Sequence, residues 1–187
     1  MSRHSLFASH RSHVRGFTLL ELLIVLAILG ILFGIAIPSL KNAVARVQAG
    51  AVRSAITATL FDGQRHATVL GREIVICPGE SQCLGGADWS QGWLAFIDLD
   101  GDRLHGPGEQ VVRREAKLPA GVRLRGSAGR PRIVYQPNGS NAGANITFTL
   151  CDRRGPKHAL ALILSNGGRL RSDRPAPAAA AACAAGL

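Results

Sequence analysis

Hydrophobic positions are distributed unevenly along this chain. Residues 17–37 contain two polar residues, Thr18 and Glu21, and no charged residue follows Glu21 as far as Ile37. As a helix, this segment would be about 31 Å long, which is enough to cross the hydrocarbon core of a bilayer. No second segment is comparably apolar, and this excludes a polytopic membrane protein.

Beyond this segment, apolar residues recur every three or four positions, as they do on one face of a helix. The series is Val44, Val47, Ala51 and Ala55, with Thr59 at its end. It predicts an amphipathic continuation to about Ala67 whose apolar face packs on a globular domain. Pro38 lies inside the helical pattern and is expected to kink or loosen the helix, because proline lacks an N–H and clashes with the preceding turn.

After Gly71 the helical period gives way to short β-rich runs separated by Gly and Asn clusters. The predicted strands are residues 74–77, 93–97, 111–114, 122–125, 132–135, 146–150 and 160–164. They predict an α+β fold in which a long N-terminal helix lies against an antiparallel sheet. The predicted organisation is a leader at residues 1–16, a helix at 17–67, a β-rich domain at 68–174 and an alanine-rich tail at 175–187.

Composition and charge further limit the possible classes of protein. Apolar residues make up 47% of the 187 residues, which excludes wholesale disorder. The formal net charge of +10 is concentrated, because residues 111–187 carry thirteen basic and three acidic residues, whereas residues 17–110 carry six basic and nine acidic residues. Residues 1–16 hold three arginines and no acid, and a basic flank of this kind keeps that end of an apolar helix in the cytoplasm.

Gly16 precedes Phe17-Thr18-Leu19-Leu20-Glu21, and the apolar helix follows directly. This arrangement resembles the prepilin cleavage and methylation motif. The resemblance implies cleavage between Gly16 and Phe17 by a prepilin peptidase, N-methylation of Phe17, and retention of the helix as the packing stalk of a pilus or pseudopilus. It also implies that the Glu21 carboxylate meets the terminal amine of a neighbouring subunit, since opposite charges attract strongly in an apolar surround.

Later segments point to one family of pilins. The Cys77–Cys83 segment, the run from Trp89 to Asp98, and the sequence Cys151-Asp152-Arg153-Arg154-Gly155 are similar to the GspH/FimT family, which contains minor pilins of type IV pili and minor pseudopilins of type II secretion. The resemblance implies that other pilin or pseudopilin subunits are partners. It also implies a single pass through the inner membrane with the C-terminal domain in the periplasm, followed by assembly into a pilus or pseudopilus.

The four cysteines allow three disulfide connectivities, and the sequence alone does not choose among them. Cys77 and Cys83 enclose a five-residue loop, so we predict a local bridge there. A second bridge between Cys151 and Cys183 would then tie down the tail, in a compartment where disulfides persist. The spacing lacks the paired C-x2-C units of a zinc site, so no metal is expected.

Residues 98–102 read Asp-Leu-Asp-Gly-Asp, as at the start of a calcium loop. An EF-hand loop needs Gly at its sixth position, whereas Gly101 is fourth when counting starts at Asp98. A turn that closes a hairpin is therefore the preferred interpretation. The chain has no recognisable nucleophile motif and no Gly-rich phosphate loop, so we expect it to be neither an enzyme nor a cofactor-binding protein.

Clustered arginines after Gln110 predict a polyanion as a partner. Gly168-Arg169-Leu170-Arg171 matches the Gly-Arg-x-Arg motif of FimT-type minor pilins from naturally competent bacteria, and the resemblance implies that Arg169 and Arg171 contact DNA phosphates. Arg174 would extend this patch by proximity, and three further residues by charge. The assigned residues beyond the two arginines are Gly168, Arg174, Arg153, Arg154 and Lys157.

The predicted function is a type IV minor pilin that binds DNA and contributes to its uptake in natural transformation. Binding would be sequence-independent, because Tyr135 and Phe148 are the only aromatic residues after Gln110 and base stacking on an aromatic platform is not expected. The alternative is a structural minor pilin, or a GspH-like minor pseudopilin of type II secretion, whose basic face docks acidic neighbouring subunits.

Overall fold

The structure, a computed structural model, describes residue 16, residues 18–142 and residues 145–187. Helix α1 (Leu19–Leu70) opens it and continues through Pro38 without a break. The chain divides into two units, Met1–Leu40 and Lys41–Leu187. In the first unit, every described residue is exposed, and this part of α1 is long and apolar enough to cross a membrane.

In the second unit, α1 buries one face against a globular body. The buried residues are Ala45, Ala49, Val52, Ile56, Thr59, Leu60, Gly63 and Ala67. The predicted face was therefore wrong by about one helix position, because Val44, Val47 and Ala51 are exposed. Small apolar residues lie on both sides of the helix, and the observed face is the one that also buries the larger Ile56 and Leu60, which removes more apolar area from water.

The helix also approaches the body closely at one point. A Cβ atom at Gly63 would lie 3.0 Å from Ile76 Cδ1 and 3.2 Å from Tyr135 Cδ2, so a larger residue there would separate helix and strands. Nearby, the buried Trp93 Nε1–H donates a hydrogen bond of 3.0 Å to Thr59 Oγ1. Thr59 is thus the one polar member of the predicted series that is buried, and it has a partner.

The described strands form two four-stranded antiparallel sheets, where the sequence predicted one. They are β1 (Ile74–Pro78), β2 (Trp93–Ile97), β3 (Val111–Glu115), β4 (Val122–Arg125), β5 (Ile133–Tyr135), β6 (Ile146–Asp152), β7 (Leu160–Leu164) and β8 (Leu170–Asp173). Sheet A has the order β3-β2-β1-β5 and sheet B the order β4-β6-β7-β8. The seven predicted strands are confirmed, whereas β8 was missed because its sequence, Leu-Arg-Ser-Asp, is short and polar.

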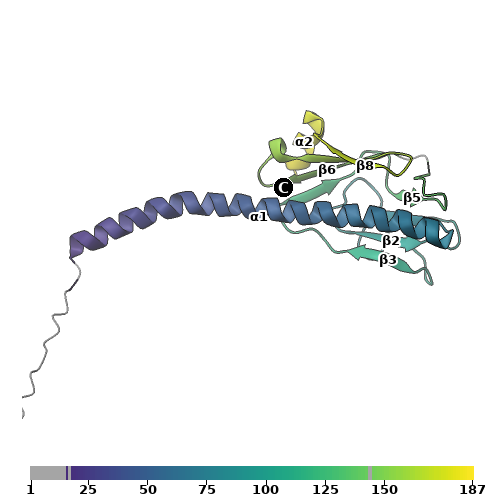
Figure 1. Ribbon diagram of the computed structural model, residues 1–187, viewed down its shortest axis with the longest axis horizontal. Coiled ribbons are helices and arrows are strands. Elements are labelled where there is room, and N and C mark those ends of the chain that lie inside the picture. Colours follow the sequence, from purple (N-terminus) through teal and green to yellow (C-terminus); the bar gives the residue numbers. More distant parts are fainter. Residues whose placement is uncertain (1–15, 17, 143–144) are drawn as a thin grey trace, which may run out of the picture. The chain divides into compact units, whose positions relative to one another are not determined.

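The inner faces of both sheets and the second part of α1 enclose the main core. Figure 1 shows this part of the helix with β2 and β3 on one side and β6 and β8 on the other. A second, smaller cluster lies on the opposite face of sheet A and contains Val75, Leu94, Phe96 and Val134. The core therefore depends on strict inward and outward alternation along each strand.

The alanine-rich tail is not an irregular end but contains a helix, α2 (Pro177–Ala184). Proline at the first turn and a run of alanines favour a helix. The helix packs on β4, on β6 and on the short 3-10 helix η1 (Pro156–His158). Ala180 and Cys183 are its buried residues. Figure 1 shows α2 on the side of sheet B away from α1.

Candidate nucleic-acid interface

The candidate DNA-binding residues lie around β8, an edge strand of sheet B. A tight turn leads into it, in which Gly168 N donates to Ser165 O at 2.9 Å and Arg169 N donates to Ser165 Oγ at 3.1 Å. Gly168 has a positive φ of 78°, and a Cβ there would collide with the Gln64 side chain. The positive φ therefore favours glycine at this point of the motif, and a larger residue would also displace the Gln64 amide.

Alternation along β8 separates its residues into two faces. Leu170 packs against the main core, and Ser172 Oγ accepts a hydrogen bond of 3.1 Å from Arg53 of α1. Arg171 and Asp173 point to the opposite, outer face, where their side chains form an exposed ion pair of 2.8 Å. Arg169 is exposed at the start of the strand, and residues two apart in a strand share a face.

The three acids of residues 111–187 are all paired with an arginine two positions away. The pairs are Arg113 with Glu115, Arg154 with Asp152, and Arg171 with Asp173. Arg154 is the most tightly held, because its guanidinium donates to both Asp152 oxygens, at 2.9 and 2.6 Å, and is largely buried. Arg154 is thus a structural residue of the β6 end, although the sequence assigned it to the DNA patch.

Two other predicted residues are brought together beside β8. Lys157 of η1 and Arg174, which directly follows β8, line one hollow of about 540 Å³ whose further walls come from α2. Within the described chain, the side chains of Lys157, Arg169 and Arg174 form no ion pair. We call Arg169, Arg171, Arg174 and Lys157 the β8 face. Arg153 is not part of it, because its side chain lies against Gly121 at the β4 edge.

The tail helix covers a second pair of arginines on the outer face of sheet B. Arg123 and Arg125 alternate with the buried Val122 and Leu124 on β4. Arg125 Nη1 donates to the Ala182 carbonyl of α2 at 3.2 Å, and Arg123 pairs with Asp88 at 3.4 Å. Both of these arginines are half-buried, whereas Arg169, Arg171 and Arg174 at the other edge of the sheet are exposed.

Both predicted disulfides are confirmed. Cys77 and Cys83 are bridged within sheet A and its following loop, with Cα atoms 5.4 Å apart. Cys151 of β6 and Cys183 of α2 are bridged across 32 residues, with Cα atoms 6.1 Å apart. The second bridge holds α2 on sheet B and so fixes one wall of the hollow beside β8.

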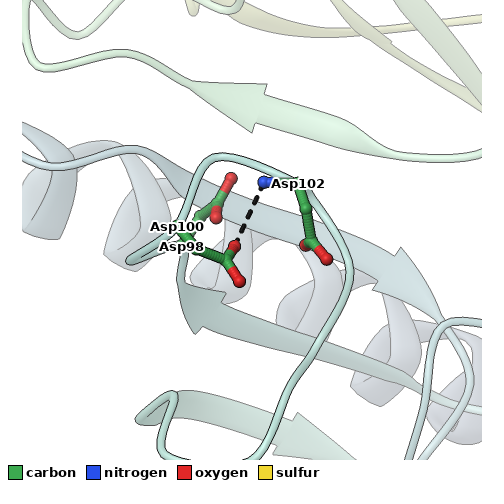
Figure 2. Close-up of side chains that lie close together, drawn as sticks. All are labelled: Asp98, Asp100 and Asp102. Carbon is green, nitrogen blue, oxygen red and sulfur yellow. Dashed lines mark hydrogen bonds between the residues drawn. The ribbon is translucent and has the colours of Figure 1, made fainter.

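The acidic loop closes the β2–β3 hairpin, as the sequence predicted. Figure 2 shows the carboxylates of Asp98, Asp100 and Asp102, whose oxygens lie within 4.8 Å of one another, with Asp102 N donating to Asp100. Among the described residues they are the group able to hold one metal ion. Asp98 already accepts the Gly101 and Arg103 N–H groups at 2.8 and 3.2 Å, and burial raises its pKa.

At the N-terminal end, Gly16 is exposed and Phe17 lies outside the described residues. Thr18 Oγ1 accepts a hydrogen bond of 3.2 Å from Glu21 N, so Thr18 caps α1 and Glu21 sits in its first turn. Thr-x-x-Glu is the spacing of a capping box. The motif therefore starts the helix and places the carboxylate at its positive end, where the helix dipole favours it.

The sequence profiles of two families match the chain. The family described as Type II transport protein GspH matches residues 44–168, and the prokaryotic N-terminal methylation motif matches residues 11–37. Fold and motif together define a minor pilin or minor pseudopilin of a type IV pilus or a type II secretion system. The chain belongs to the GspH family. Membership implies assembly with other pilin subunits and processing by a prepilin peptidase.

Similar proteins include two pilins and a solved minor pilin. Pilin-like protein PilA1 of Thermus thermophilus is 29% identical over 166 residues, which are 85% of this chain and 98% of that protein. Type IV major fimbrial protein FimA of Dichelobacter nodosus is 47% identical over 62 residues, 29% of this chain and 39% of that protein. A crystal structure of the type IV minor pilin FimU of Pseudomonas aeruginosa has a TM-score of 0.54 at 18% identity, covering 71% and 90% of the two chains, and shows the same fold.

Proposed function

We propose that this chain is a minor pilin of a type IV pilus that binds DNA through the β8 face and contributes to DNA uptake in natural transformation. The observation that carries the proposal is the exposure of Arg169 and Arg171 at a sheet edge, beside two further cations without ion pairs. A guanidinium fork fits phosphate oxygens, and closely spaced cations suit a polyanion.

The binding mechanism follows from what the face lacks. Tyr135 and Phe148, the aromatic residues of the last part of the chain, are both buried in the main core, so neither is available to stack on a base. Recognition is therefore through the phosphate backbone, without sequence preference and with a steep decrease in affinity as salt rises, because bound counterions are released. Several subunits along one filament would raise a weak affinity by multivalency.

The N-terminal residues direct processing, membrane insertion and filament assembly. A prepilin peptidase cleaves between Gly16 and Phe17, Phe17 is N-methylated, and Glu21 pairs with the new amine of a neighbouring subunit. Before assembly, the chain crosses the inner membrane once and holds its domain in the periplasm, where it meets incoming DNA. The protein is not an enzyme, and its partners are pilin subunits and DNA.

Titration of residues 41–187 with duplex DNA tests the proposal. Every buried residue of the described chain lies in this unit, so the fragment keeps the complete core. We expect binding whose log affinity falls linearly with log salt. Arg169→Gln with Arg171→Gln should weaken it by roughly tenfold or more, because two charged phosphate contacts are lost.

The matched control removes two arginines elsewhere. Arg72 and Arg114 are exposed, and neither is in an ion pair within the described chain. Arg72→Gln with Arg114→Gln changes the net charge equally and should reduce affinity only slightly. Equal losses in the two double variants would mean that net charge, and not the β8 face, causes binding.

The second candidate function is a minor pseudopilin of type II secretion, favoured by the family whose profile matches most of the chain. On this alternative, the β8 face docks an acidic neighbouring subunit. A deletion strain separates the two functions, because loss of protein secretion with full transformation supports the pseudopilin, and the opposite phenotype supports the DNA-binding pilin.

A further inference from the structure

The hollow beside β8 differs from an ordinary basic surface in its shape and in its walls. Its volume of about 540 Å³ lies in the range of small-ligand sites and exceeds the space that one phosphate group needs. Two cations, Lys157 and Arg174, line it, and the other lining residues are all proline or alanine. A ligand that fits must therefore carry a negative charge and an apolar body of moderate size.

Three separate segments form these walls. Arg174 and Pro175 follow β8, Lys157 belongs to η1, and the third wall, which includes Pro177 and Ala181, belongs to α2. The Cys151–Cys183 bridge holds the third wall in place. The hollow is thus a product of the docked tail, and we call it the tail pocket.

We infer that the tail pocket binds one nucleotide unit of single-stranded DNA, an inference that rests on the proposed function. The phosphate is held by Lys157 and Arg174, and the deoxyribose and base lie against the proline and alanine walls. The Lys157 ammonium is a compact charge on a flexible side chain, and the Arg174 guanidinium is planar, so together they can bind a phosphate in several orientations. The nearby Arg169 and Arg171 hold the neighbouring phosphates of the same strand.

The tail pocket should bind single-stranded DNA more tightly than duplex DNA, because only in a single strand is a nucleotide free to enter it. In a duplex, the base is paired and stacked, so a nucleotide can enter a pocket only after it is unstacked and swung out, at a cost in free energy. A single strand is spared most of this cost. The tail pocket therefore makes the protein prefer single-stranded DNA, whereas Arg169 and Arg171 contact either form.

Two measurements on residues 41–187 test this inference. In an NMR titration with thymidine 5′-monophosphate, the amide resonances of Lys157, Ala159, Arg174 and Ala181 should shift. In a binding titration at one low ionic strength, a short oligothymidylate should bind roughly tenfold more tightly than a duplex of equal length, because the pocket adds one charge-assisted contact and an apolar contact.

Three kinds of variant make the test specific. Lys157→Gln with Arg174→Gln should lower the ratio of single-strand to duplex affinity to about one, and Arg114→Gln with Lys117→Gln is its charge-matched control on the sheet A side. Ala181→Leu fills the pocket without a change of charge, and it should lower the same ratio several-fold. A third variant, Cys151→Ser with Cys183→Ser, should lower the ratio by releasing the α2 wall.

The outcomes separate this inference from the proposed function. If duplex binding depends on Arg169 and Arg171 but thymidine monophosphate shifts no pocket resonance, the tail pocket is not a nucleotide site and the proposed function stands. If the pocket resonances shift but the Arg169 and Arg171 changes leave duplex affinity unaltered, the pocket stands and the proposed DNA face is wrong. An oligoglutamate peptide that shifts the pocket resonances more strongly than the nucleotide would overturn the inference in favour of an acidic protein partner.

Discussion

The two sheets have the same number of strands and the same antiparallel pairing, and they enclose one core, yet their outer faces differ. Strand β1 reads Ile-Val-Ile-Cys-Pro and is buried at every position, whereas β4 reads Val-Arg-Leu-Arg and alternates between buried and half-buried. The outer face of sheet A holds a second apolar cluster. That of sheet B carries arginines, threonines and a helix tied on by a disulfide.

This difference between the outer faces indicates which sheet has surface residues available to bind a partner. On sheet A, both faces contribute to stability, and loops cover the outer cluster, as where the ring centroids of Phe96 and His105 lie 5.2 Å apart. On sheet B, the main core lies on the inner face, and α2 packs on the outer face of β4 and β6, where the Cys151–Cys183 bridge holds it. Arg169 and Arg171 at the β8 edge are exposed, and they can therefore bind a partner without a cost to folding.

The largest expected effect comes from truncating one apolar residue on each of the two outer faces. Phe96→Ala in sheet A should lower the free energy of unfolding by about 3–5 kcal/mol, because a fully buried phenylalanine leaves a cavity. Ile163→Ala in sheet B should cost less than about 2 kcal/mol, because this side chain is only half-buried. Urea unfolding of residues 41–187 measures both, and equal losses would remove the distinction between the faces.

The two disulfides should differ in a way that loop length alone does not predict. By chain entropy, the bridge across 32 residues would stabilise by about 3.7 kcal/mol and the bridge across 6 residues by about 2.2 kcal/mol. Cys183, however, lies in a peripheral helix, and the cost of losing its bridge is limited to the free energy that holds the tail in place.

We therefore expect Cys151→Ser with Cys183→Ser to lower the free energy of unfolding by clearly less than about 3.7 kcal/mol. Amide hydrogen exchange should increase in residues 175–187 and stay slow in β6. Cys77→Ser with Cys83→Ser is the comparison on sheet A, and it should affect the cluster around Val75 and Phe96. A uniform increase in exchange after loss of the Cys151–Cys183 bridge would contradict the peripheral role of the tail.

The sequence predicted the elements better than their arrangement. The N-terminal motif, seven strands and the Cys77–Cys83 bridge depend on local patterns, such as the apolar run of 17–37 or the short loop between the two cysteines, and the sequence was enough to predict them. The Cys151–Cys183 bridge spans 32 residues, and it was predicted only because these were the two cysteines left over. The division into two sheets was not, because pairing partners are chosen by contacts between residues far apart in the chain. The helix face was misplaced for the same reason, since Ile56 and Leu60 are selected by the sheets that they touch.

In the candidate site, too, the sequence alone did not show which residues lie together in the fold. The Gly-Arg-x-Arg motif located Arg169 and Arg171, and a local turn explains their exposure. Arg153, Arg154 and Lys157 are neighbours in sequence, yet the first lies at the β4 edge, the second is held by Asp152, and the third lines the tail pocket. All three residues carry one positive charge, and their different roles follow from what each side chain contacts in the fold.

A carboxylate at the end of β6 should stabilise sheet B at neutral pH. Burial alone would raise the pKa of Asp152, but the hydrogen bonds and charge of Arg154 outweigh it and hold the pKa below its ordinary value. Its stabilisation is therefore present above the unfolded pKa of about 3.9 and is lost as pH falls through the lower folded value. Asp152→Asn should cost about 1.5–3 kcal/mol at pH 7, and this cost should shrink in unfolding measurements below about pH 3.9.

The carboxylate after β2 should show the opposite sign and the smallest effect. Burial raises the pKa of Asp98, the N–H groups of Gly101 and Arg103 oppose this shift, and nearby Glu109 and Asp100 add to it. Asp98 thus contributes stability that is fully present below the unfolded pKa of about 3.9 and is lost as pH rises through the higher folded value. Relative to the wild type, Asp98→Asn should become more stable as pH rises from 3 to 7, by less than about 1 kcal/mol.

The sign of this trend is the informative quantity, because Asn keeps one acceptor oxygen for the loop and loses the other at every pH. If Asp98→Asn instead became less stable toward neutral pH, as Asp152→Asn should, the ionised Asp98 would be a stabilising group. The acidic loop of sheet A would then depend on its charge in the way that the end of β6 does.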